Sequence, residues 1–321
     1  MFSNILSIQN LDLLVVGVVV AATCVLGFII FFNGRDSVTN RTFLYFSLVT
    51  AIWGSVNYFS YQFTDPEILI WLFRGILFSA VFQAFFLHRL FLVIPNKNYV
   101  FNKMHSFVVV PLVLITSIVT LTPFMFVQIV GIPVVGEVAI VDKGPGIMLF
   151  VVVAVGLVFN AILNLILKIK NFSETVEKKA LRLILVGVII MFFLIILFNL
   201  VIAVAFTNPK FVPYGALFVF PFIILTSYSI YKHQLFNLRI ASVGLIAFVL
   251  SVFSFFNIIY AKSTSQIILN TTFFFIILIG SITLIRTILR EVEQREYLQV
   301  LNTELKDLLK QRESLVHLIT H

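Results

Sequence analysis

Long apolar runs separated by short polar segments occupy most of this 321-residue sequence. A helix needs about 20 mostly apolar residues to cross the hydrocarbon core of a bilayer. Runs of that length predict transmembrane helices at residues 11–32, 43–61, 68–94, 107–127, 147–167, 183–206, 212–231, 241–260 and 267–288. The pattern therefore predicts an all-α polytopic membrane protein with about nine transmembrane helices.

After the ninth run, the sequence changes to charged residues with regularly placed apolar ones. The regular positions are Leu298, Leu301, Leu305, Leu308, Arg312, Leu315 and Ile319. Their spacing of three and four residues is the a/d pattern of a left-handed coiled coil, so we predict a parallel dimeric stalk. Ile285, Leu289 and Val292 follow a different phase, which predicts a stutter between Val292 and Leu298. An amphipathic tail lying on the membrane is the alternative.

The composition agrees with a membrane protein. Hydrophobic residues make up 60% of the chain and charged residues only 11%, whereas about a quarter of the residues in a soluble domain are charged. The 22 Lys and Arg residues outnumber the 14 Asp and Glu residues, but most of them lie in short loops, as membrane insertion requires. Nucleic-acid binding is therefore not expected. Cys24 is the only cysteine, so an internal disulfide and a thiolate metal site are excluded.

The basic residues are unequally divided between the two alternating sets of loops. One set contains Lys143, Lys210 and Lys262. The other contains Arg35, Arg41, Arg89, Lys97, Lys103, Lys168, Lys170, Lys178, Lys179, Arg182, Lys232 and Arg239. Because loops rich in Lys and Arg stay in the cytoplasm, we predict a protein of the bacterial inner membrane with its N-terminus outside and its C-terminus in the cytoplasm.

The longest predicted outer loop, residues 128–146, contains two short stretches rich in Val and Ile on either side of Gly136-Glu137. This arrangement predicts a short extracellular β-hairpin over the outer face. Gly144-Pro145-Gly146 then breaks the chain before the fifth span. An ordinary connecting loop and a lid over a ligand are both open interpretations of this hairpin.

Polar residues inside a span are costly unless they have partners or a function, so each is a candidate site. Arg74 and Gln83 lie in the third predicted span, and Asn160 and Asn164 share one face of the fifth. These four are the candidate ligand-binding residues. Hydrogen bonds between helices are the alternative for the amides, and a side chain that reaches outward to water is the alternative for Arg74.

Further polar residues flank or end the third span. Asp65 and Glu67 precede it and are candidate ion-pair partners of Arg74. His88 and Arg89 lie near its predicted cytoplasmic end, where an interfacial role is expected rather than ligation of haem or a metal ion. No span contains an Asp or Glu near its middle, which argues against a proton-coupled pump.

The sequence reaches Leu315-Val316-His317-Leu318-Ile319-Thr320-His321. A segment of this pattern, after a membrane anchor and a heptad stalk, resembles the phosphoacceptor helix of sensor histidine kinases. The resemblance places His321 at the phosphoacceptor position and Thr320 at the small residue before it. A neutral imidazole is a nucleophile near pH 7, so it is suited to accept a phosphoryl group. A surface histidine on a charged helix is the alternative.

Three features of the membrane part support this resemblance through their order along the chain. They are TPFMF before the predicted hairpin with its GPG end, the basic loop Lys168–Arg182, and SYSIYKHQLFNLRI at Ser227–Ile240. Together they resemble the seven-helix N-terminal region of many bacterial sensor histidine kinases. The resemblance implies signal input through the helices, dimerisation through the stalk and phosphotransfer to a response regulator, but it does not identify the ligand.

Catalytic motifs are absent from the sequence: no Walker-type loop, kinase ATP-binding motif, HExxH or GxSxG occurs. We therefore expect no cofactor or metal in this chain. ATP and Mg²⁺ are expected only in the catalytic domain of a complete parent protein. The resemblance implies that this parent is an ATP-dependent protein histidine kinase and that the present chain is truncated at the phosphoacceptor helix.

The expected organisation is a seven-helix membrane sensor region at 1–239, two further spans at 240–288, a coiled-coil stalk at 289–314 and the start of the dimerisation and phosphoacceptor helix at 315–321. The expected function is signal input and dimerisation in a two-component sensor histidine kinase. Its expected partners are a second copy, a response regulator and membrane lipid. A transporter or channel with a dimerising tail, or the same sensor joined to another output such as a cyclase, are the alternatives.

Overall fold

The computed structural model describes residues 8–32, 35–94, 99–131, 139–171, 176–198, 202, 211, 214–232, 250–251, 253–255, 257 and 264–319. Its helices are α1 (Ile8–Phe32), α2 (Val38–Phe59), α3 (Pro66–Val93), η1 (His105–Val109), α4 (Val110–Thr120), α5 (Gly146–Asn171), α6 (Val176–Ile196), α7 (Gly215–Lys232) and α9 (Thr264–Ile319). Two strands, β1 (Phe126–Val130) and β2 (Ile140–Lys143), form a small antiparallel sheet.

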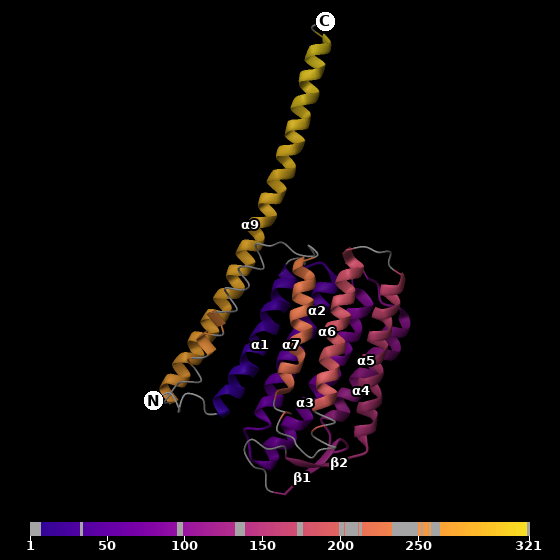
Figure 1. Ribbon diagram of the computed structural model, residues 1–321, viewed down its shortest axis with the longest axis vertical. Coiled ribbons are helices and arrows are strands. Elements are labelled where there is room, and N and C mark those ends of the chain that lie inside the picture. The colour runs from indigo at the N-terminus through magenta and orange to yellow at the C-terminus, as the bar shows by residue number, and fades with distance from the viewer. Residues whose placement is uncertain are drawn as a thin grey trace.

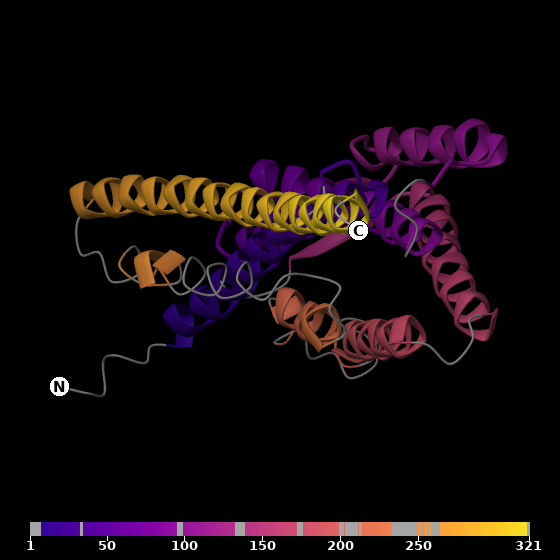
Figure 2. The same cartoon turned by 90° about the horizontal axis from the view of Figure 1, so that it is seen from above.

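Helices α1 to α7 form a bundle, with β1 and β2 at one end and α9 rising beyond the other end (Figure 1). Following the predicted orientation, we call the end that carries the strands the outer end and the opposite end the inner end. Helices α6 and α7 lie side by side (Figure 2). A Cβ atom at Gly187 of α6 would lie 3.1 Å from the Cα atom of Phe222 in α7, so the small residue permits this close packing. The Phe222 ring in turn meets the Phe46 ring of α2 edge-on, with centroids 5.5 Å apart.

Many of the helices are suited to a bilayer, as the apolar runs predicted. Five described segments are long and apolar enough to cross one: Val15–Phe32, Pro66–Val93, Gly146–Asn171, Lys178–Ile196 and Ile268–Ile288. Helices α2 and α7 coincide with two more predicted runs, while the run at 241–260 lies largely outside the described residues. The largely helical fold is therefore confirmed, and its apolar helices are consistent with a membrane protein, whereas the total of nine spans stays a prediction.

The fourth span was predicted at 107–127, and its end was wrong. Helix α4 stops at Thr120. The hydroxyls of Thr120 and Thr122 donate to carbonyls of the last helical turn, and Pro123 has no N–H with which to continue the helix. Phe126, inside the predicted span, instead begins β1.

The predicted β-hairpin is present as the pair β1 and β2, with Ile129 opposite Val141. The turn expected at residues 136–137 lies outside the described residues. Gly144 directly follows β2 and packs closely against the backbone of Phe124. A Cβ atom at Gly144 would lie only 2.1 Å from the Phe124 carbonyl oxygen. Only glycine permits this approach of two backbones.

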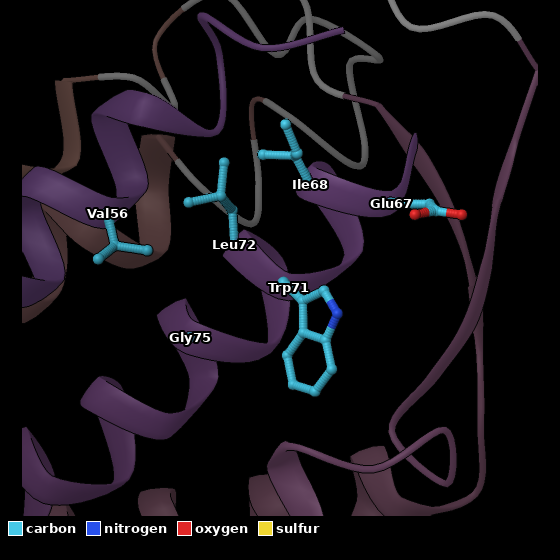
Figure 3. Close-up of a pocket in the computed structure, with 6 residues that line it drawn as sticks. All are labelled: Val56, Glu67, Ile68, Trp71, Leu72 and Gly75. Carbon is cyan, nitrogen blue, oxygen red and sulfur yellow. The ribbon is translucent and has the colours of Figure 1, made fainter. Parts of the chain in front are cut away.

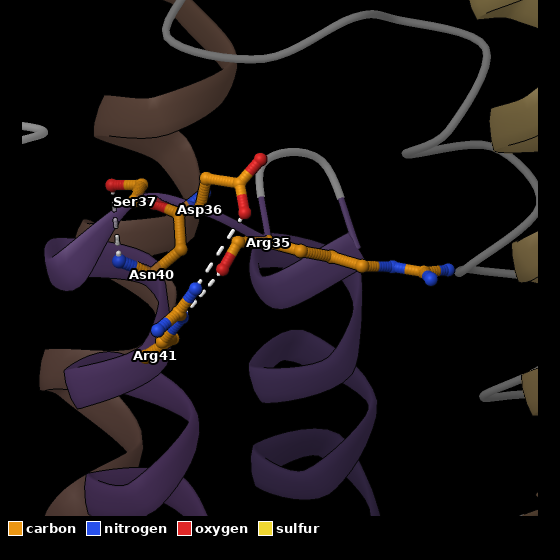
Figure 4. A network of polar contacts seen from close by, with 5 residues as sticks. All are labelled: Arg35, Asp36, Ser37, Asn40 and Arg41. Carbon is orange, nitrogen blue, oxygen red and sulfur yellow. Dashed lines mark hydrogen bonds and ion pairs between the residues drawn. The ribbon is translucent and has the colours of Figure 1, made fainter.

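Polar side chains gather at the inner end of the bundle, where α2 begins (Figure 4). The Ser37 hydroxyl accepts a hydrogen bond from the Asn40 N–H at 3.4 Å and caps the helix. Arg41 donates from Nε to the Arg35 carbonyl at 2.6 Å and lies 3.6 Å from the Asp36 carboxylate. This ion pair is exposed, so it contributes little to stability.

Helix α9 runs without interruption over 56 residues. Its first half contacts α1, and Ser281 and Ile285 are buried in that half. Its second half extends past the inner end of the bundle (Figure 1). The ninth predicted span and the predicted stalk therefore belong to a single helix.

Candidate functional site

Arg74 joins α3 to the outer sheet. Its side chain is only 7% exposed, and its Nη2 atom donates to the carbonyl oxygen of Phe126 at 2.8 Å. The guanidinium carbon lies 5.2 Å from the centre of the Trp71 ring, within cation–π range. This candidate residue therefore ties the hairpin to the bundle and does not reach out to water.

Neither expected carboxylate pairs with Arg74, so that prediction was wrong. Asp65 accepts hydrogen bonds from the N–H groups of Glu67 and Ile68 at 2.8 and 3.2 Å, which makes it the N-cap of α3. Glu67 lies two helical turns from Arg74, about 10 Å along the axis. The backbone carbonyl of Phe126 takes the place of a carboxylate.

An apolar groove lies next to Arg74, between α2 and α3. Its volume is about 500 Å³, and its lining residues are Val56, Glu67, Ile68, Trp71, Leu72 and Gly75. Val56 comes from α2 and the other five from α3 (Figure 3). We call it the outer groove. Trp71 both lines the groove and contacts Arg74, so an occupant of the groove would touch a residue that contacts the link to β1.

The other three candidate ligand-binding residues lie elsewhere. Gln83 donates to the Thr50 hydroxyl of α2 at 3.1 Å, which is an ordinary bond between helices. Asn160 lies 3.0 Å from Nε2 of His88 through its amide oxygen, and that oxygen also accepts from Asn164. The two asparagines share a face, as predicted, but the four candidates form three separate contacts and not one site.

A second group of side chains gathers at the inner end of α3. It consists of Phe85, His88, Arg89, Phe101 and His105, and we call it the inner cluster. The His105 ring stacks near those of Phe101, His88 and Phe85, with centroids 4.7, 5.7 and 5.8 Å away. The Arg89 guanidinium lies 4.1 Å from the Phe101 ring centre and 5.5 Å from that of Phe85.

Backbone geometry places His105 in this cluster. It begins η1, a π-helical turn in which the Val110 N–H donates to the His105 carbonyl. Pro111 follows and lacks an N–H, so the normal hydrogen bond to the residue four positions earlier is not formed. The wider turn accommodates this loss, and such turns are frequent at functional sites.

Lys168 of α5 closes the end of α3 beside the inner cluster. Its ammonium group donates to the carbonyls of Leu92 and Ile94, which would otherwise lack helical partners. The Lys168 Nζ atom also lies 6.0 Å from the Tyr99 ring centre. A positive charge is thereby held at the negative end of the α3 dipole.

Sequence reasoning found His88 and Arg89 but missed the part played by His105, Phe101 and Lys168. Their basic and aromatic character was visible. Their meeting depends on the turn between α3 and η1 and on the packing of α5, which no local pattern reveals. Within the described residues, no three His, Cys, Asp or Glu side chains gather as a metal site.

The predicted phosphoacceptor His321 and its neighbour Thr320 lie outside the described residues. Comparisons with protein-family models, with curated proteins and with solved structures find no match. The function is therefore argued from the geometry of this chain.

Proposed function

We propose that this chain is the signal-input and dimerisation portion of a membrane sensor histidine kinase. The observation that carries the proposal is α9, a single helix of 56 residues that joins a membrane-spanning segment to a polar rod. The bundle would receive the signal, and α9 would transmit movement to His321. A catalytic domain would supply ATP and Mg²⁺, and a response regulator would receive the phosphoryl group.

The polar half of α9 has an unpaired apolar stripe. Leu298, Leu301, Leu305 and Leu308 are between 48% and 62% exposed, and their spacing places them on one helical face. Burying a leucine contributes about 1.5–3 kcal/mol, so a row of exposed leucines in water favours association. A second copy of the same helix presents the matching stripe, which supports a parallel dimer.

The continuity of α9 supports its role in transmission. No proline or glycine occurs after Gly280, and sharp helix kinks nearly always need one of these or a local irregularity. A tilt or rotation of the segment beside α1 would therefore reach the stalk. The change of heptad phase between Val292 and Leu298 is our candidate for the element with two packing states, which such a switch requires.

The contacts of the bundle provide a route for the input. The outer groove lies between α2 and α3, α2 packs on α1, and α1 contacts α9. An amphipathic molecule in the groove would alter the packing of α2 against α3. It would also press on Trp71, which contacts Arg74 and thus the link to β1.

The alternative of a transporter is less well supported. It predicts polar groups that converge at one depth inside the bundle. Arg74, Gln83 and Asn160 instead contact β1, α2 and α3 respectively. These separate contacts suit a bundle that changes its packing better than one that carries a polar solute.

Cysteine cross-linking in membranes tests the dimer. In a Cys24→Ser background, Leu305→Cys should form an intermolecular disulfide rapidly under mild oxidation. Thr303→Cys, on the opposite face of the same helix turn, is the matched control and should cross-link at least tenfold more slowly. Equal rates at the two positions would exclude a parallel stalk with the predicted seam.

Phosphorylation of the complete gene product tests the output. With ATP and Mg²⁺, the wild type should acquire acid-labile phosphate, and His321→Gln should abolish it. His317→Gln, one turn earlier, should retain phosphorylation. Normal labelling of His321→Gln would exclude His321 as the phosphoacceptor.

A further inference from the structure

The inner cluster contains buried nitrogen atoms for which no hydrogen-bond partner is found among the described residues. They are Nδ1 of His88, Nε of Arg89 and both ring nitrogens of His105. His88 and His105 are only 5% and 7% exposed. Buried polar groups are nearly always hydrogen-bonded in native structures, and leaving one unpaired costs about 1–3 kcal/mol. Several such atoms in one place, unpaired within the described ranges, make the cluster a candidate site for a bound group.

The missing group should be an anion. Arg89 carries a permanent positive charge and makes no ion pair among the described residues, and Lys168 adds a second charge nearby. No Asp or Glu occurs between Glu67 and Glu137, or between Asp142 and Glu174. The residues of α3, η1 and α5 around the cluster lie in these two stretches. Tyr45 of α2 also faces Arg89, and α2 contains no Asp or Glu. The described residues around the cluster therefore supply no carboxylate as a counter-charge.

The surroundings of the cluster indicate where the anion comes from. Met104, Phe107, Val108 and Leu112 leave a strongly exposed apolar surface along η1 and α4, with Phe107 76% exposed. The cluster lies toward the C-terminal end of α3, where His88 contacts Asn160 of α5, and both helices are suited to cross a bilayer. An anion with attached hydrocarbon would satisfy both features, because basic pockets between helices at this level of a membrane bind phosphate headgroups.

We propose that the inner cluster binds the phosphate of an anionic phospholipid, whose acyl chains lie along η1 and α4. The guanidinium of Arg89 provides a planar fork that matches two phosphate oxygens. The ring nitrogens of His105 and His88 are further donors beside it, in the tautomers or protonation states that carry hydrogen. The proposal does not rest on the kinase assignment, since it depends only on the geometry and surroundings of the inner cluster.

Native mass spectrometry of the full chain in detergent tests the site with defined probes. The probes are dioleoylphosphatidylglycerol, dioleoylphosphatidylcholine and inorganic phosphate. Phosphatidylglycerol should bind at least tenfold more tightly than phosphatidylcholine. Arg89→Gln should weaken phosphatidylglycerol binding about tenfold or more, the effect of losing a charge-assisted hydrogen bond. Arg41→Gln, which removes the same charge from the same end of the bundle, should have less than a threefold effect.

Each contrary result would overturn a distinct part of the proposal. Equal binding of the two lipids would show that the cluster does not select an anionic lipid. Displacement of the lipid by millimolar inorganic phosphate would show that the site takes a soluble anion. Equal effects of Arg89→Gln and Arg41→Gln would show that general charge, and not the cluster, attracts the lipid.

Photolabelling of the wild-type protein with a reactive lipid tests the site without any substitution that could impair folding. A phosphatidylglycerol with a photoreactive diazirine in one acyl chain should label peptides from η1 and α4, residues 104–112, more than any other region. Labelling spread evenly over the apolar surface would overturn the proposal. Arg89→Lys, which keeps the charge but loses the planar fork, should bind phosphatidylglycerol with intermediate affinity.

Discussion

Arg74 and Arg89 lie on the same helix, about four turns apart, in opposite surroundings. The Nε atoms of both are buried and find no partner in the part of the chain that the structure describes. Arg74, however, donates from Nη2 to a carbonyl of its own chain, in β1. Arg89 rests on two aromatic rings and no hydrogen bond to it is found within the described residues. Arg74 is thus tied to its own chain, whereas Arg89 is a donor that the proposed anion would engage.

Helix α9 repeats this contrast on a larger scale. Ile285 is buried in the half that passes the bundle, while Leu301 and Leu305 are exposed in the half beyond the inner end. Exposed leucines and unpaired cationic groups require different partners, a second helix and an anion. Both lie toward the predicted cytoplasmic side. The comparison leads to the proposal that contacts within the chain hold the outer half, while a second helix and an anion complete the inner half.

The largest effect should come from the exposed stripe of α9. Leu305→Asp places a charge in the predicted dimer seam on both chains, so we expect dimerisation to weaken at least about 100-fold. Single-molecule photobleaching of the protein in nanodiscs measures the dimer fraction. Thr303→Asp, on the opposite face, should leave the fraction unchanged. If Leu305→Asp leaves the dimer intact, the exposed leucines of α9 do not form the dimer seam, and the proposed role of a second helix is wrong.

The next effect concerns transmission through the stalk. One alanine inserted between Val292 and Leu298 rotates every later residue by about 100°. If the proposed kinase function holds, phosphorylation of His321 should therefore change at least about tenfold. An insertion of seven residues keeps the heptad phase and should restore most of the signal response. Normal output from the one-residue insertion would remove the phase change as the switching element.

The hydrogen bond of Arg74 should have a moderate effect on the outer end. Arg74→Leu removes the bond to β1, so we expect the free energy of unfolding to fall by about 1–3 kcal/mol. Hydrogen exchange of the amides at Phe126–Val130 should also become faster. Arg41→Gln breaks an exposed ion pair and should lower stability by less than about 1 kcal/mol. Equal losses would mean that the outer end is not specially held by Arg74.

The smallest effect should come from the amide beside the inner cluster. Asn160→Leu removes the partner of His88 Nε2, and polar bonds of this kind contribute about 0.6 kcal/mol in membrane bundles. Asn164→Leu leaves that contact in place and should change the unfolding free energy less. Reversible unfolding in mixed micelles measures both. A loss of several kcal/mol for Asn160→Leu would show that the inner end depends on internal bonds as much as the outer end does.

The elements that depend on local pattern were predictable from the sequence. Apolar runs gave the positions of α1, α3 and α5, because lipid-facing helices need apolar side chains at every turn. The sequence also indicated the chain break at Gly144-Pro145-Gly146 before α5. The residues of the predicted heptad stalk lie within the single helix α9. In each case the deciding interactions lie within a few residues of one another.

The features that depend on distant contacts were not predictable. The partner of Arg74 is a backbone carbonyl 52 positions away, and a carbonyl has no signature in sequence. The end of α4 was misplaced because Phe126 is equally apolar in a helix and in a strand. The contact between the His105 and His88 rings depends on the turn of the chain after α3. Two histidines that are distant in the sequence therefore lie in one cluster, which the sequence did not predict.

The unbroken course of α9 has a mechanical consequence. From Ile288, where its apolar segment ends, to Ile319, where the helix ends, the rod extends about 46 Å. Pivoting by only 5° at the membrane would swing its tip by about 4 Å, roughly the width of a methyl group. A lever of this length would convert a slight change of angle among lipid-embedded helices into a change of reach that a bulky domain at its tip could follow.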